Sequence, residues 1–169
     1  MVLAYFITFT TYGTRLHGNE NGSVDRDHNA YGTPFLAADL EREQSERAAM
    51  AQAPYVMSAR ERDIACKAIV DLAADRGWQL LAVHVRSTHV HVVIRTEERD
   101  PGRTMSDIKA RASRDLNQAG FDGPSRKRWT RHGSTRYLFR EEDVEAKIRY
   151  TLDEQGERTA WYAQEPRTK

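Results

Sequence analysis

Apolar residues recur along this chain with two different periods, and each change of period marks a new element. Residues 2–10 form a run of aromatic and β-branched side chains that ends before Gly13, which is typical of a buried strand. Two runs rich in Val and Ile, 79–86 and 89–95, are separated by only two residues and are expected to pair as an antiparallel hairpin. A short fourth strand is predicted over 135–139.

The first long helix is predicted directly after a polar stretch of the chain. Residues 14–57 are rich in Gly, Asn, Asp and Glu, so we interpret them as a long insertion with one helix near 40–51. Ser58 followed by Glu61 makes a capping box, after which apolar residues recur at helical spacing until Gly77. These signals predict the first long helix.

Two more helices are expected in the second half of the chain. Thr104 with Asp107 is predicted to cap a helix that ends at Gly120. Its apolar stripe consists of Met105, Ile108, Ala112, Leu116 and Ala119. A final helix is predicted over 141–155, with Gly156 as its stop.

The order of these elements is strand, helix, strand, strand, helix, strand, helix. A middle hairpin flanked by helices predicts an α+β ferredoxin-like sandwich with a central antiparallel sheet. We expect one domain over residues 1–169, interrupted by the insertion at about 14–57, because a chain of 169 residues suits a single core.

The composition narrows the class of protein. With 39% hydrophobic and 30% charged residues, the chain is typical of soluble globular proteins. One cysteine, Cys66, excludes an intrachain disulfide and a cysteine-based zinc site, which fits a cytoplasmic protein. The apolar start is too short for a membrane span and lacks the features of a secretion signal, so we expect no membrane partner.

Two histidines are placed to bind a metal. In His89-Val90-His91 both imidazoles project from one face of the predicted strand, where they could share one divalent cation with an oxygen donor as third ligand. Such a site suits Mg²⁺ or Mn²⁺. For a bare His-x-His motif, the simpler interpretation of two half-buried polar residues is favoured over a metal site.

Other conspicuous side chains are interpreted as structural. His84 lies in the hairpin without a second histidine on its own strand face, so we expect a hydrogen-bonded structural residue. Trp78 and Trp161 are predicted to pack against the protein.

The last predicted helix carries a tyrosine on its polar stripe. Val144, Ile148 and Leu152 define its packing face, and Tyr150 lies one turn from charged residues. These neighbours suit a tyrosine that loses its proton, although an ordinary amphipathic tyrosine at a helix edge would look the same.

Basic residues concentrate over 103–140. Ten Lys or Arg stand against three Asp in this region, and an aromatic ring adjoins the basic run at Trp129. The residues predicted to bind nucleic acid are Arg126, Lys127, Arg128, Trp129 and Arg131. The alternative is a solvated loop with Trp129 packed into the core.

These motifs together resemble a known family. The strand Arg86-Ser-Thr-His-Val-His-Val-Val-Ile94 and the tyrosine of the C-terminal helix are similar to those of IS200/IS605-type single-tyrosine transposases of the HUH endonuclease superfamily, including relatives associated with repetitive extragenic palindromes (REP). The opening strand, Gly77-Trp78, Trp129 and Arg136-Tyr137 fall in the family's order. The resemblance covers most of the chain outside the insertion, and many relatives have Met-Pro-Asn where this chain has Arg86-Ser-Thr88.

The resemblance implies the HUH endonuclease fold and a role for each motif. His89 and His91 would bind Mg²⁺ or Mn²⁺, and Tyr150 would be the nucleophile. Glu154 occupies the position of the third ligand, where the family usually has Gln or Asn; Gln155 follows directly, so the choice between them stays open.

The implied activity is that of a single-stranded DNA endonuclease and strand transferase. It would form a 5′-phosphotyrosine intermediate on hairpin-bearing single-stranded DNA, as a monomer or a homodimer, with Tyr150 acting on its own histidines or on a partner's. Two alternatives remain open: a catalytically inactive DNA- or RNA-binding regulator, and a histidine-based phosphoesterase that uses water.

Overall fold

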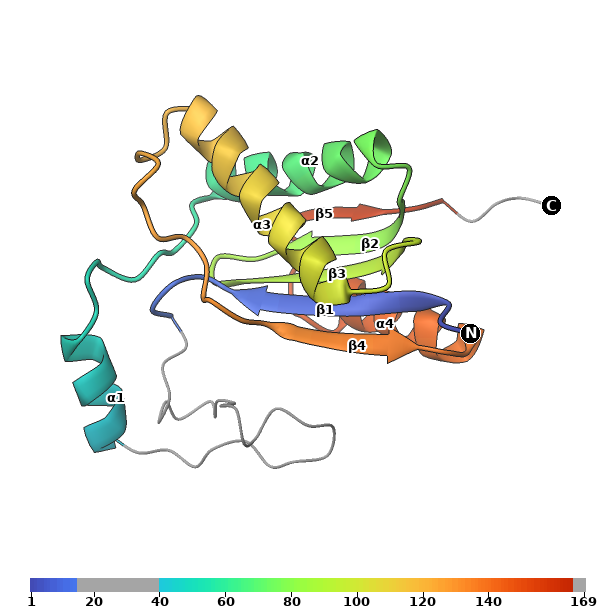
Figure 1. Cartoon of the computed structure of the whole chain (residues 1–169), viewed down its shortest axis with the longest axis horizontal. Coiled ribbons are helices and arrows are strands. Elements are labelled where there is room, and N and C mark those ends of the chain that lie inside the picture. The colour runs from blue at the N-terminus through green and yellow to red at the C-terminus, as the bar shows by residue number, and fades with distance from the viewer. Residues whose placement is uncertain (15–39, 166–169) are drawn as a thin grey trace.

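Five strands form one antiparallel sheet in the computed structural model, which describes residues 1–14 and 40–165 (Figure 1). The spatial order is β4-β1-β3-β2-β5. The strands are β1 (Ala4–Thr10), β2 (Gln79–Val85), β3 (His89–Arg95), β4 (Ser134–Leu138) and β5 (Ala160–Ala163). The first four confirm the predicted strands and have the order of a ferredoxin-like sandwich.

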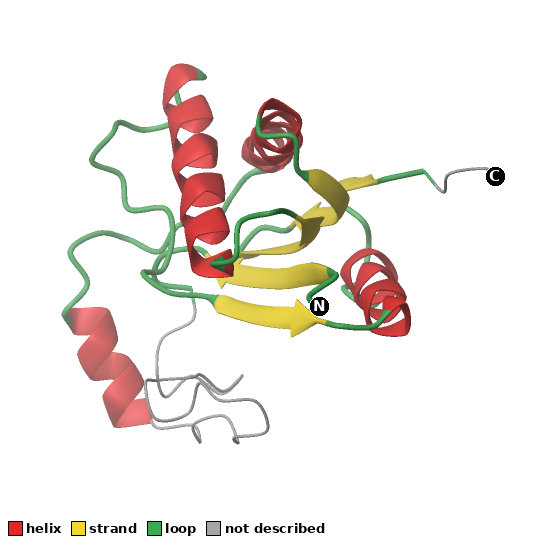
Figure 2. Ribbon diagram, turned by 45° about the vertical axis from the view of Figure 1, so that its right-hand side comes forward, coloured by secondary structure: helices red, strands yellow, loops and turns green. Residues whose placement is uncertain are grey.

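Helices cover both faces of the sheet (Figure 2). The covering helices are α2 (Ala59–Asp75), α3 (Pro101–Gln118) and α4 (Glu141–Asp153), whereas α1 (Leu40–Ala48) stands apart from the sheet (Figure 1). Figure 2 shows α2 and α3 on one side and α4 on the other, so we call these the α2/α3 face and the α4 face. The α+β class predicted from the sequence is confirmed.

The helix starts are explained by their caps, one of which the sequence analysis missed. α2 begins after Ser58 with both hydrogen bonds of the predicted capping box to Glu61. α3 starts earlier than predicted, because the Asp100 side chain accepts a hydrogen bond from Gly102 N at 2.9 Å and Pro101 occupies the first turn. The predicted cap, Thr104, is instead a buried residue inside the helix.

The main core lies between the sheet and α2 and α3. Alternate residues of the three central strands point into it, among them Ile7 of β1, Val83 of β2 and Val92 of β3, each fully buried. Most of the predicted apolar stripe of α3 is buried there too, but Ala119 is the exposed C-cap. Cys66 of α2 is buried, and desolvation raises the pKa of its thiol to about 12.

A smaller core lies under α4. Phe6, Val93 and Ala82 from neighbouring strands pack there with Val144 and Leu152 of α4. It occupies one end of the α4 face only, because the other end of the same strands carries threonines and histidines. α4 therefore packs on the sheet next to the threonines and histidines of the same strands.

The fifth strand is a correction to the sequence analysis. β5 pairs antiparallel with β2 at the edge of the sheet, although no strand was predicted after Gly156. Trp161, predicted to pack, is 44% exposed in this strand. A segment of four residues is too short to show a period, so its Trp-Tyr pair was the only signal.

The predicted insertion is described only in its second half. α1 confirms the helix expected near 40–51, and residues 15–39 lie outside the described part of the chain. None of the helices in the described ranges is both long and apolar enough to cross a membrane.

Candidate functional site

The predicted histidine pair projects from the α4 face. His89 and His91 alternate along β3 with Val90 and Val92, which point into the main core. The centroids of the two imidazole rings are 4.9 Å apart. β3 therefore brings two ring nitrogens close enough to share a ligand.

The His91 ring is enclosed on several sides. It is 5% exposed and stacks on Phe6 with ring centroids 5.8 Å apart. Thr8, its in-register neighbour on β1, hydrogen bonds through Oγ1 to His91 Nδ1 at 3.0 Å. Nε2 is buried without a hydrogen-bond partner among residues 1–14 and 40–165. A bond at Nδ1 that leaves Nε2 available is the usual environment of a metal-binding imidazole.

Electrostatics keep His91 neutral. Desolvation, the larger cause, and the nearby His89 together lower the pKa of His91 from 6.5 to about 3. A neutral imidazole has the lone pair that a cation requires. The buried Nε2 and this neutral state together fit a metal ligand.

Tyr150 of α4 lies against the same histidine. Its ring centroid is 5.7 Å from that of His91 and 5.8 Å from that of Phe6, both in edge-to-face contact. Lys147, one turn earlier, places Nζ 4.9 Å from the centroid of the Tyr150 ring. The predicted tyrosine and histidines, distant along the sequence, therefore meet within one chain.

The two candidates for the third ligand lie in different environments. Glu154, the C-cap of α4, is exposed and pairs with Arg149 at 3.8 Å. Within the described ranges, no cluster of three or more His, Cys, Asp or Glu side chains is arranged to bind a metal, so Glu154 does not join the histidines. The Gln155 side chain contacts His91 and opposes the lowering of its pKa.

His84 fastens the end of α4 to the sheet. It pairs with His91 across β2 and β3, a neighbour that the analysis of a single strand could not reveal. Its Nδ1 donates to Thr151 O at 3.0 Å and its Nε2 accepts from Thr159 N at 3.1 Å. His84 is a hydrogen-bonded structural residue, as predicted.

The predicted nucleic-acid segment is partly structural. Trp129 packs against Phe9, and its indole N–H donates to Lys109 O and Ser113 Oγ, so its ring is not presented for stacking. Arg128 is 3% exposed and donates to Phe121 O. Arg126 donates to Gln52 Oε1 and to the carbonyls of Ala53 and Pro54.

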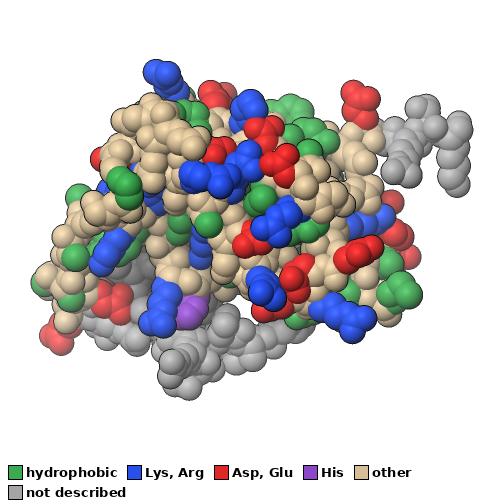
Figure 3. Space-filling model, turned by 45° about the horizontal axis from the view of Figure 1, so that its top comes forward, with side chains coloured by type: hydrophobic (Ala, Val, Ile, Leu, Met, Phe, Trp, Pro, Cys, Tyr) green, Lys and Arg blue, Asp and Glu red, His purple; other side chains and the backbone are tan. Residues whose placement is uncertain are grey.

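Two residues of that segment remain exposed. Lys127 and Arg131 reach solvent, and Arg131 follows Thr130, whose hydroxyl contacts Thr10 next to His89. On the side of the molecule shown in Figure 3, Lys and Arg are interleaved with Asp and Glu. A role in binding nucleic acid stays a prediction for Lys127 and Arg131.

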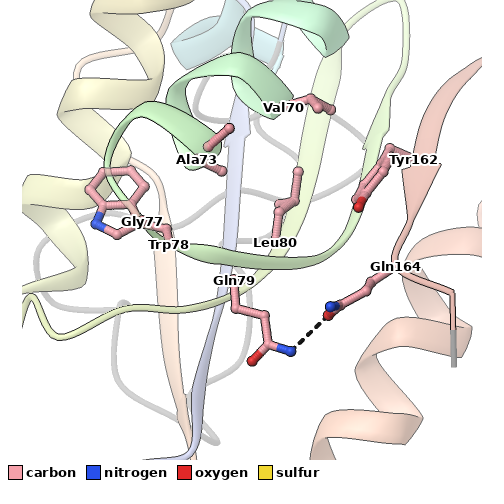
Figure 4. Close-up of a pocket in the computed structure, with 9 residues that line it drawn as sticks. Val70, Ala73, Gly77, Trp78, Gln79, Leu80, Tyr162 and Gln164 are labelled. Carbon is pink, nitrogen blue, oxygen red and sulfur yellow. Dashed lines mark hydrogen bonds between the residues drawn. The ribbon is translucent and has the colours of Figure 1, made fainter. Parts of the chain in front are cut away.

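An open pocket of about 350 Å³ lies away from the histidines (Figure 4). Val70 and Ala73 of α2, Leu80 of β2 and Tyr162 of β5 line it, and a hydrogen bond between Gln79 and Gln164 spans its rim. It belongs to the α2/α3 side of the sheet, so Tyr162 and its neighbour Trp161 project from opposite faces.

Comparison with known sequences gives one family. The sequence profile described as "Transposase IS200 like" matches residues 55–148, more than half of the chain. The match includes His89 and His91 and ends before Tyr150. A search of curated proteins finds no significant match.

Two solved structures are similar to the chain. One is a REP-associated tyrosine transposase bound to a REP hairpin, with 13% identity, a TM-score of 0.46, and coverage of 88% of this chain and 64% of that one. The other, from Deinococcus radiodurans R1, is provisionally assigned as a transposase, with 14% identity, a TM-score of 0.47 and coverage of 87% of each chain. The chain thus spans less than two thirds of the first structure.

Proposed function

Because the chain belongs to the IS200-like transposase family, we propose that it cuts and rejoins single-stranded DNA through a covalent bond to Tyr150. The observation that carries this proposal is the contact between the rings of Tyr150 and His91, with centroids 5.7 Å apart on the α4 face. The proposed substrate is a single strand bearing a hairpin, the kind of DNA named for one of the similar structures.

His89, His91 and Gln155 are the proposed ligands of a divalent cation. The buried Nε2 of His91, without a protein partner in the described part of the chain, supports this choice. Two imidazoles and an amide oxygen suit Mn²⁺, and with added water also Mg²⁺. When bound, the cation supplies positive charge to the scissile phosphate.

In the proposed reaction, the Tyr150 oxygen attacks phosphorus and the 3′-oxygen of the neighbouring nucleotide leaves. One phosphate ester replaces another, so a 3′-hydroxyl can later attack the phosphotyrosine and release the enzyme. Lys147, whose pKa is lowered first by desolvation, is the candidate acceptor of the phenolic proton. Phe6 and Lys147 both contact the ring of Tyr150.

The experiment uses a labelled hairpin oligonucleotide with Mn²⁺ and a denaturing gel. Wild type should give a covalent protein–DNA species, which Tyr150→Phe should abolish while it keeps DNA binding. Tyr137→Phe, at an exposed tyrosine of β4, is the matched control and should form the adduct normally. An adduct that survives Tyr150→Phe would remove the assignment; binding without any adduct in the wild type would favour the inactive regulator, and cleavage without an adduct the phosphoesterase.

A second experiment separates the two third-ligand candidates. Gln155→Ala should raise the Mn²⁺ concentration needed for half-maximal cleavage by about 10- to 100-fold, the range found when groups supporting a metal are removed. Glu154→Ala should leave this concentration unchanged, because Glu154 faces solvent beside Arg149. The opposite result would assign the metal to Glu154.

A further inference from the structure

The α4 face continues beyond the histidines toward the edge of the sheet. In-register pairing aligns four side chains in one row across the strands: Thr8, His91, His84 and Trp161. Adjacent strands are spaced by about 4.8 Å, so Trp161 lies roughly 10 Å from His91 along this row. One or two nucleotides of an extended strand can span that distance.

Trp161 presents an aromatic ring at the end of the row. Its side chain is 44% exposed although it is large and apolar. The guanidinium carbon of Arg158 lies 4.6 Å from the ring centroid, and Arg158 is itself held by Leu152 O and the Asp153 carboxylate. The ring is therefore supported by a fixed cation, an arrangement that suits base stacking.

Arg86 places a positive charge beside the histidines of this row. It follows β2 and its N–H donates to His89 O, so it adjoins the histidine pair. Its guanidinium lies against Gly156, and its charge acts on both His84 and His91. Among residues 1–14 and 40–165, no carboxylate forms an ion pair with Arg86, whereas Arg158 pairs with Asp153.

We propose that Trp161 and Arg86 form a nucleotide-binding strip beside the active site, in which Trp161 stacks a base of the single strand and Arg86 binds a phosphate next to the scissile one. This inference rests on the proposed function and names the surface that function requires. The strip replaces the role expected of Trp129, whose ring packs in the core.

The aromatic part is tested by anisotropy with a labelled oligothymidine in a chelating buffer, with Tyr150→Phe in every protein so that no adduct forms. Trp161→Ala should weaken binding about tenfold, within the range measured for stacked bases. Trp161→Phe should restore most of the affinity. Tyr162→Ala is the matched control, because this neighbour points from the opposite face of β5 and should leave affinity unchanged.

The cationic part is tested by the salt dependence of the same binding. Arg86→Gln should reduce the slope of log affinity against log salt by about 0.7, the contribution of one phosphate contact in a single strand. Arg103→Gln, at an exposed arginine on α3 across the sheet, removes the same charge and should leave the slope unchanged. A purely structural role for Arg86 would not alter the slope.

The outcomes distinguish the inference from the proposed function. If the Tyr150→Phe parent binds the oligonucleotide but Trp161→Ala and Arg86→Gln bind with its affinity and slope, the strip is wrong and the nuclease assignment stands. If the parent binds neither the oligothymidine nor the hairpin oligonucleotide, both fail. Circular dichroism of each variant identifies one that has lost its fold. If Trp161→Ala is unfolded, the affinity of Trp161→Phe and the salt slope of Arg86→Gln decide whether the strip binds DNA.

Discussion

The two faces of the sheet use the same strands for different purposes. On the α2/α3 face, in-register residues of neighbouring strands such as Ile7, Val92 and Val83 form a continuous apolar core. On the α4 face, a smaller core around Phe6 gives way along the same strands to His89 and His91. Since side chains alternate along a strand, one residue step separates a packing position from a chemical one.

The residues that stabilise the sheet and the residues of the candidate site therefore lie on opposite faces of the same strands. The α2/α3 face has two long helices and the larger core, so it can hold the strands in register. The α4 face can then leave a buried nitrogen of His91 without a protein partner. Substitutions at neighbouring positions should therefore have different consequences.

The largest effect should come from His91→Ala. Removing a metal ligand should lower metal-dependent cleavage about a hundredfold or more, since even groups that only support a ligand contribute 10- to 100-fold. Val92→Ala, at the next residue and on the other face, should cost about 2 kcal/mol of unfolding free energy and leave the cleavage rate of the folded protein near normal. Cleavage assays measure the rate and urea unfolding measures the free energy of unfolding. Equal activities for the two variants would contradict the assignment of different roles to the two faces.

The next largest effect concerns the unequal cores. Ile69→Ala in α2 removes a side chain that is 1% exposed and should destabilise the fold by about 2–5 kcal/mol. Ile148→Ala in α4, where the side chain is only partly buried, should cost clearly less. Denaturant unfolding of both variants measures the difference, and an equal or greater loss at Ile148 would mean that α4 stabilises the sheet as much as α2 does.

A smaller effect is expected from His84→Leu. This change leaves Thr151 O and Thr159 N without their side-chain partner, which should cost about 1–3 kcal/mol. It also frees the end of α4 near Tyr150, so adduct formation should slow more than DNA binding weakens. Thermal unfolding and single-turnover adduct formation measure the two effects; a variant with unchanged stability would show that the two hydrogen bonds do not fasten α4.

The last effect is a gradual dependence of stability on pH. Burial lowers the pKa of His91 to about 3 and lowers that of His84, so the folded chain binds fewer protons than the unfolded chain below pH 6.5. The unfolding free energy should therefore fall as pH decreases from about 6.5 toward 3, by at most about 1.4 kcal/mol per pH unit for each histidine. Urea unfolding in a chelating buffer should show a shallower dependence for His91→Gln, and an unchanged one would contradict the shift.

Much of this division could be predicted from the sequence. The alternation of His89 and His91 with valines indicates from the sequence alone that both histidines lie on one face of the strand. The capping box at Ser58 likewise marks the start of α2. The nearness of Tyr150 to the histidines could be expected only through the family resemblance, because helical spacing does not show which strand a helix covers.

Other features depend on packing that a one-dimensional pattern does not contain. Gln155 and Glu154 are adjacent in sequence, and the path of the chain after α4 decides which side chain meets His91. Trp129 and Trp161 each adjoin basic residues, yet only the pairing of β5 with β2 leaves the second exposed. The short edge strand therefore leaves Trp161 exposed, whereas Trp129 packs against the core.

The turn between β2 and β3 limits how this protein can evolve. Only three residues, Arg86, Ser87 and Thr88, connect the strands, and His89 is the first residue of β3. Inserting one residue directly before His89 without lengthening the turn would shift the register of β3 by one residue, which would move both imidazoles into the apolar layer and expose the valines. Lineages of this chain should therefore vary the hairpin by substitution, whereas insertions and deletions should accumulate elsewhere.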